Sequence, residues 1–160
     1  MRKPIIIVLT ASLILVLSAL TSAAGLGPPR YSQQPCLKYE PRDVELIGLV
    51  KRTVFAGPPN YESVRRGDVA EPYWVLQLAQ PICVTADPAD VTNSKEVRVR
   101  DLPLIFDDVH DYAKYESLLR QRAAVTGTLT HAITGHHHTA VMLVVKRMKL
   151  ASTPPNNKRL

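Results

Sequence analysis

Hydrophobic and polar positions alternate in five segments of this sequence, and a helical spacing separates the third from the fourth. The segments are residues 44–55, 73–85, 96–104, 123–133 and 139–150. The third shows the pattern clearly, because Val97 and Val99 alternate with Arg98 and Arg100. A period of two with many β-branched residues predicts strands.

The helical spacing lies between residues 107 and 122. Val109, Tyr112, Glu116 and Leu119 recur at near-helical intervals, and an aspartate pair just before them can cap the first turn. The predicted order of elements is therefore β-β-β-α-β-β.

This order predicts an all-β fold with one helix, in the form of an OB-fold-like five-stranded barrel. Gly48 and Gly127 each lie in the middle of a strand, where a barrel strand must bend. We expect the barrel domain to span residues 43–150. Another small β-barrel or a β-sandwich is the alternative.

Residues 1–24 predict a secretory signal peptide. Arg2 and Lys3 precede an apolar run from Pro4 to Leu20, and small residues follow as far as Ala24. An uncleaved anchor is the alternative, but the run is at the short end for a spanning helix. No second apolar run reaches that length, so we expect a periplasmic or secreted protein without a transmembrane segment after cleavage.

The segments flanking the barrel differ from it in composition. Residues 25–42 are rich in proline, glycine and polar side chains, which predicts an extended lead-in. Residues 151–160 are polar and contain Pro154 and Pro155, which predicts a disordered tail.

The sequence contains two cysteines, Cys36 and Cys83. In an exported chain they predict one disulfide, with two free thiols as the alternative. The loop that this bridge closes is long, so the chain-entropy model gives it a stabilisation of about 4 kcal/mol.

Three consecutive histidines, His136 to His138, lie between the last two predicted strands. Neutral imidazoles are common ligands of zinc, copper and nickel. In an extended segment His136 and His138 project to one side. A third ligand must come from elsewhere: His131 on the adjacent strand is a candidate, as are the more distant His110, Asp68 and Glu62. A polar loop, or a structural latch of histidines hydrogen-bonded to the backbone, is the competing interpretation.

A stiff loop follows the first strand, with the sequence GPPNYES at residues 57–63 and Gly67-Asp68 after it. One hypothesis is an ordered binding loop, and the other is an Ω-like loop held by its own hydrogen bonds. We expect this loop and the 134–139 hairpin to approach each other. The candidate ligand-binding residues are Asn60, Tyr61, Glu62, Asp68 and His137.

Charge and composition argue against several functions. The formal net charge is +6, and it falls to about +4 without Arg2 and Lys3, which is too mild to indicate nucleic acid. Two phenylalanines do not provide a stacking array for single strands. The chain has neither a glycine-rich phosphate loop nor a glycine elbow beside Ser63.

Four strings together resemble a family of exported bacterial proteins, the domain of unknown function DUF4431. They are GPPNYES, Gly67-Asp68, the stretch from Leu78 to Val84, and TGHHHT at residues 134–139. The resemblance spans residues 36–148. It implies an exported protein that shares these two loops, and it transfers no activity.

We therefore expect a non-enzymatic exported module that binds a small ligand, a peptide or a glycan through the two loops. One alternative is a transition-metal protein using His136, His138 and His131. A second alternative is a hydrolase using Glu62 or Asp68 with a histidine.

Overall fold

The computed structural model describes residues 35–152. The predicted signal peptide, the lead-in up to residue 34 and the tail from residue 153 lie outside the described residues. Within residues 35–152, no helix is long and apolar enough to cross a membrane.

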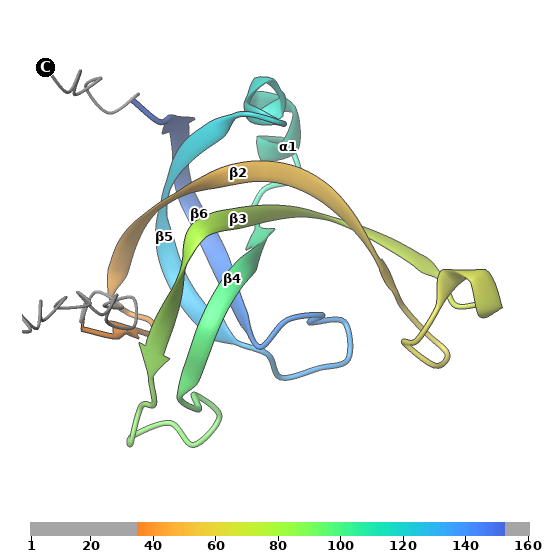
Figure 1. The fold of residues 1–160 in the computed structure, drawn as a ribbon, viewed down its shortest axis with the longest axis horizontal. Coiled ribbons are helices and arrows are strands. Elements are labelled where there is room, and N and C mark those ends of the chain that lie inside the picture. The colour runs from red at the N-terminus through yellow and green to blue at the C-terminus, as the bar shows by residue number, and fades with distance from the viewer. Residues whose placement is uncertain (1–34, 153–160) are drawn as a thin grey trace, which may run out of the picture. The chain divides into compact units, whose positions relative to one another are not determined.

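The described chain is mostly β (Figure 1). The strands are β1 (Leu37–Lys38), β2 (Asp43–Ala56), β3 (Ala70–Thr85), β4 (Glu96–Ile105), β5 (Arg122–His131) and β6 (Val141–Leu150). Three short helical turns complete it: η1 (Val64–Arg66), α1 (Asp111–Lys114) and η2 (Glu116–Leu118). The five predicted strands are confirmed as β2 to β6, and the end of the predicted lead-in contributes β1.

The six strands form one mixed sheet in the order β1-β3-β2-β5-β6-β4, and β3 also pairs with β4. Five strands therefore make a near-closed ring. The weakest link is the parallel contact of β4 with β6, which consists of the pairs Leu104–Leu143 and Ile105–Val144. The other pairings within the ring are antiparallel and longer.

β2 bends so that it can pair with two neighbours. Residues 43–49 pair with β5 and residues 48–56 pair with β3, and Gly48 takes part in both pairings. A Cβ atom at Gly48 would lie 2.5 Å from the carbonyl oxygen of Gln77, so the close approach requires glycine. Gly127 lies at a register shift between β5 and β6. A Cβ atom there would clash with the carbonyl oxygen of Val144, so this position also requires glycine.

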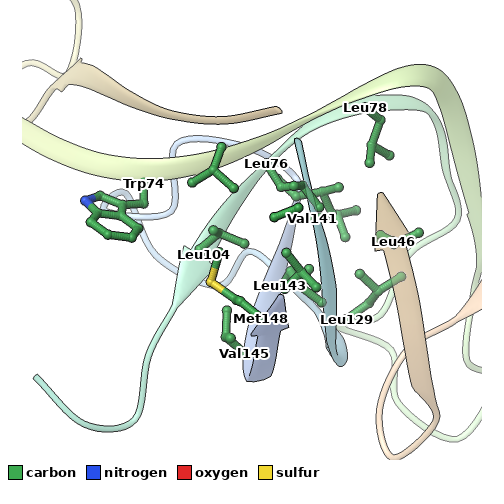
Figure 2. Packing of buried hydrophobic residues seen from close by; sticks show 14 of the residues in the cluster. Leu46, Trp74, Leu76, Leu78, Leu104, Leu129, Val141, Leu143, Val145 and Met148 are labelled. Atoms are coloured by element: carbon green, nitrogen blue, oxygen red, sulfur yellow. The ribbon is translucent and has the colours of Figure 1, made fainter. Parts of the chain in front are cut away.

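Side chains from all five ring strands fill the centre of the ring. Leu76, Leu104, Leu129, Val141 and Leu143 are completely buried and lie together in Figure 2. Each buried aliphatic side chain of this size contributes about 1.5–3 kcal/mol by leaving water. The core therefore holds the ring closed where the β4–β6 backbone pairing is short.

The prediction of one continuous helix between β4 and β5 is wrong. Residues 111–118 form α1 and η2 only, and Arg120 has a left-handed backbone with φ 63°. The amide of Arg120 donates to the Val50 carbonyl at 2.8 Å, and the Val50 amide donates to Gln121 at 3.0 Å. The backbone N–H of Arg120 and the carbonyl of Gln121 are thus hydrogen-bonded to β2 and not within a helix. The helical segment therefore ends before Arg120, although the predicted helix continued to residue 122.

Within residues 35–152, the distal half of the β2–β3 pair has no other strand beside it. Residues 52–56 pair with residues 70–74 and lie beyond the stretches that pair with β5 and β4. We call this two-stranded segment the hairpin arm; it leads to the 57–69 loop in Figure 1. Because side chains alternate along a strand, Phe55, Glu71 and Tyr73 project from one face of the arm.

A disulfide joins Cys36 to Cys83, as the sequence predicts, with the two Cα atoms 4.7 Å apart. The bridge lies beside the pairing of Leu37 with Val84, so it fixes the short strand β1 against β3. It closes a separation of 47 residues, which includes the whole hairpin arm.

Replacing both Cys36 and Cys83 with serine should lower the free energy of unfolding by about 4 kcal/mol, because the unfolded chain regains its loop entropy. Urea denaturation of both proteins without reductant measures the change, and reduced wild type should match the variant. Two free thiols in denatured, unreduced wild type would contradict the bridge.

Candidate functional site

The 57–69 loop and the 132–140 loop meet at the hairpin arm. The rings of Tyr61 and His136 lie 5.7 Å apart, edge to face. A Cβ atom on Gly135 would lie 3.1 Å from the Tyr61 ring, so the loops touch at a glycine. The Tyr73 hydroxyl also donates to the His136 carbonyl at 3.1 Å. These contacts confirm the prediction that the two loops approach each other.

A single carboxylate on the arm holds the histidine loop. The two Glu71 oxygens lie 2.8 Å from His136 Nδ1 and 2.8 Å from His138 Nε2. Because an ionised carboxylate only accepts hydrogen bonds, each ring donates an N–H to it. We call Glu71, His136 and His138 the histidine latch. It joins the β5–β6 loop to the start of β3.

Aromatic packing fixes the inner half of the latch. The His138 ring stacks on Phe55, with centroids 4.6 Å apart and planes 8° apart, and it meets Tyr73 edge-on at 5.3 Å. Only 7% of the His138 side chain is exposed, whereas 55% of His136 is. The latch therefore has one buried ring and one ring that faces solvent.

Two opposing effects set the ionisation of Glu71. Partial burial raises the pKa of its carboxyl group, but the hydrogen bonds and the charge of His138 and His136 lower it more. The resulting pKa lies below the usual value of 4.5. Glu71 thus remains an acceptor for both rings in mildly acidic solution.

Asp68 organises the 57–69 loop from within. Its carboxylate accepts the backbone N–H groups of Asn60, Glu62 and Ser63 at 2.7–3.0 Å, and the Asn60 side-chain amide at 3.1 Å. The bonds from Ser63 and Glu62 outweigh the desolvation of the group and lower the Asp68 pKa to about 2. This network supports the Ω-like interpretation of the loop.

The remaining candidate residues of this loop have separate roles. Asn60 is used inside the loop, and Glu62 forms an exposed ion pair with Arg66 at 2.8 Å. Tyr61 has a left-handed backbone with φ 58°, and its half-exposed ring reaches the histidine loop. Of the four residues, Tyr61 is thus the one that extends from the loop to its neighbour.

The other two histidines among the candidate site residues, His137 and His131, make contacts of their own. His137 Nδ1 accepts the N–H of Ile133 at 2.9 Å, which closes the base of the histidine loop. His131 lies near Glu96, with 3.0 Å between Nε2 and the carboxylate, and it packs against Tyr39. His131 therefore does not join His136 and His138.

The structure does not assemble the predicted metal ligands. Across residues 35–152, no group of three or more His, Cys, Asp or Glu side chains is placed to hold a metal ion. His136 and His138 are both hydrogen-bonded to Glu71. This agrees with a structural latch, although the partner is a carboxylate and not the backbone. The hydrogen bonds and the ion pair that the structure describes for Glu62 and Asp68 are made within their own loop and involve no histidine.

Glu71 is the residue of this candidate site that the sequence did not predict. The predicted second strand starts at Tyr73, whereas β3 starts at Ala70 and places Glu71 opposite Phe55. The signal was present as an isolated acid between the Gly-Asp turn and the aromatic pair Tyr73-Trp74. Reading the strand two residues earlier would have put Glu71 and Tyr73 on one face.

Residues 102–149 match the family model described as Domain of unknown function (DUF4431). The matched segment runs from within β4 to the end of β6 and contains the whole histidine loop. Glu71 and the 57–69 loop precede it. No curated protein matches the sequence.

Replacing Glu71 with glutamine should release the histidine loop, because each ring uses its own carboxylate oxygen and the amide puts an NH2 donor in place of one of these acceptors. We expect the Ile133 amide, which His137 protects, to exchange with solvent roughly tenfold faster. Glu96→Gln, which alters the His131 contact, is the matched control and should leave Ile133 unchanged. Equal exchange in all three proteins would show that the latch does not order the loop.

Asp68 makes the stability of the protein depend on pH. Its folded pKa of about 2 lies below the usual value of 3.8, so its contribution is complete above about pH 4 and is lost as the pH falls toward 2. Asp68→Asn should therefore be less stable than wild type near neutrality, and the difference should shrink toward about pH 2.

Urea unfolding at several pH values measures this effect. Asp107→Asn, at an exposed aspartate, provides the control and should show a constant difference from wild type. An Asp68→Asn difference that does not change with pH would contradict the loop network.

Proposed function

We propose that this protein, whose residues 102–149 match the DUF4431 family model, is a non-enzymatic binding module. The joined 57–69 and 132–140 loops are its binding surface. The observation that carries this proposal is that Glu71 ties the histidine loop to the arm that bears the other loop. A surface fixed before binding loses less conformational entropy when a ligand docks.

We also propose that the ring is an OB-fold. The five strands follow the neighbour order β2-β3-β4-β6-β5, and β4 and β6 run parallel. This order, with the helical segment between β4 and β5, supports the OB assignment. In that fold the loops after the first strand and between the last two strands help to bind the ligand, and they correspond to the two loops of the proposed surface.

The side chains around the junction favour a peptide or glycan as ligand. Tyr61, Val64, Val69 and Ile133 are exposed, with 70% of Ile133 accessible, and Glu62 and Arg66 lie next to them. Tyrosine offers a flat apolar ring with a polar tip, which suits sugar rings and peptide side chains alike. The sequence has neither a glycine-rich phosphate-binding loop nor a strong positive charge, so it does not suggest a nucleic-acid ligand.

Export fits the same proposal. The N-terminal sequence predicts a signal peptide, and a disulfide such as Cys36–Cys83 persists in oxidising compartments. We therefore propose that the ligand is met in the periplasm or outside the cell.

The test is an NMR titration of the tag-free, metal-free mature protein. The probes are soluble peptidoglycan fragments, which carry glycan and peptide together, with chitotetraose and trialanine as single-chemistry probes. We expect saturable shifts at the amides of residues 60–62 and 133–137. Tyr61→Ala should weaken binding by about tenfold or more, because it removes the central aromatic contact.

The matched control is Val91→Ala, which trims an exposed side chain in the β3–β4 loop and should leave affinity unchanged. Absence of shifts with every probe would contradict the proposal. A tight equivalent of zinc, copper or nickel in untreated protein, lost in His136→Ala/His138→Ala, would favour the metal alternative instead.

A further inference from the structure

A recess lies on the face of the hairpin arm opposite the histidine latch. Its volume is about 520 Å³, within the range of small-molecule sites. The lining residues are Arg52, Pro72, Trp74, Tyr112, Ala113 and Glu116. Arg52 pairs directly with Trp74 across β2 and β3, so both project from the face that Phe55 and Glu71 do not use.

Aromatic rings form the fixed wall of this recess. Trp74 and Tyr112 lie 5.4 Å apart with their planes at 87°, and Phe106 packs edge-on against both. Trp74 is almost fully buried, whereas 38% of Tyr112 is exposed. The outer ring is thus held in place from behind and open to a ligand in front.

Polar groups without partners lie beside this wall. The side chains of Arg52 and Glu116 are exposed, and neither forms a hydrogen bond or ion pair with another residue in the range 35–152. The indole nitrogen of Trp74 lies at the end of its ring away from the labelled core residues (Figure 2). The recess therefore offers N–H donors and a carboxylate acceptor next to apolar rings.

The charges of the lining residues indicate which class of ligand the recess can bind. Arg52 and Glu116 carry opposite charges, so the lining carries no net charge that would select an anion or a cation. A neutral sugar presents C–H groups that pack on an aromatic face and hydroxyl groups that both donate and accept hydrogen bonds. We propose that this recess binds a neutral sugar ring of an oligosaccharide, at a site separate from the joined loops.

Trp74 is the only tryptophan in the sequence, so its fluorescence reports on this recess alone. The experiment titrates the whole mature protein with chitotetraose, cellotetraose and maltotetraose, and with trialanine and succinate as peptide and anion probes. We expect a saturable change with at least one neutral oligosaccharide and none with trialanine or succinate.

Variants then locate the binding. Arg52→Ala, Glu116→Gln and Tyr112→Ala should each weaken affinity by about tenfold, and Tyr112→Phe should retain most of it because the ring remains. Arg52 and Glu116 are exposed, so these variants are expected to fold, and near-UV circular dichroism verifies this. Tyr61→Ala, on the other side of the arm, should leave the Trp74 titration unchanged.

Three results would overturn the proposal. One is the absence of a saturable Trp74 change with every neutral oligosaccharide. Another is a change that none of the recess variants weakens. The third is binding of succinate that Arg52→Ala abolishes and Glu116→Gln strengthens, which would make the recess an anion site. Because Tyr61→Ala tests the joined loops separately, failure of one site is distinguishable from failure of the other.

Discussion

The antiparallel pairing of β2 with β3 is the constraint on which both candidate sites depend. Nine residue pairs join the strands from Gly48–Leu78 to Ala56–Ala70, well past the point where either strand has another neighbour. Alternation along this pair gives the hairpin arm two distinct faces. The face with Glu71 receives the histidine loop, and the face with Arg52 and Trp74 lines the recess beside Tyr112. A shift of one residue in register would exchange the two faces.

Carboxylates, together with aromatic packing, hold the two loops at the hairpin arm. Asp68 collects the amides of its own loop, and Glu71 collects two imidazoles from a loop more than sixty residues away. Hydrogen bonds to an ionised group are stronger than those between neutral groups. Few residues can therefore order two surface loops that lie outside the main core.

The latch also joins the segment that matches the DUF4431 family model to a strand that precedes the match. The histidines fall within the DUF4431 match, and Glu71 lies before it. The matched segment covers the end of β4, all of β5 and nearly all of β6, but the ring closes only with β2 and β3. The matched segment therefore supplies half of the junction, and the preceding strands supply the other half.

The sequence by itself determined the five strands of the ring, the position of Gly48 and Gly127, and the Cys36–Cys83 bridge, because these follow from local periodicity and residue chemistry. It also marked the two loops that meet. The tertiary structure decided the rest. The helix after β4 shortened because Arg120 and Gln121 pair with β2, and His136 and His138 found Glu71 because strand pairing put it beside them. Contacts between distant residues depend on the register of the paired strands, and the sequence of one strand alone does not determine that register.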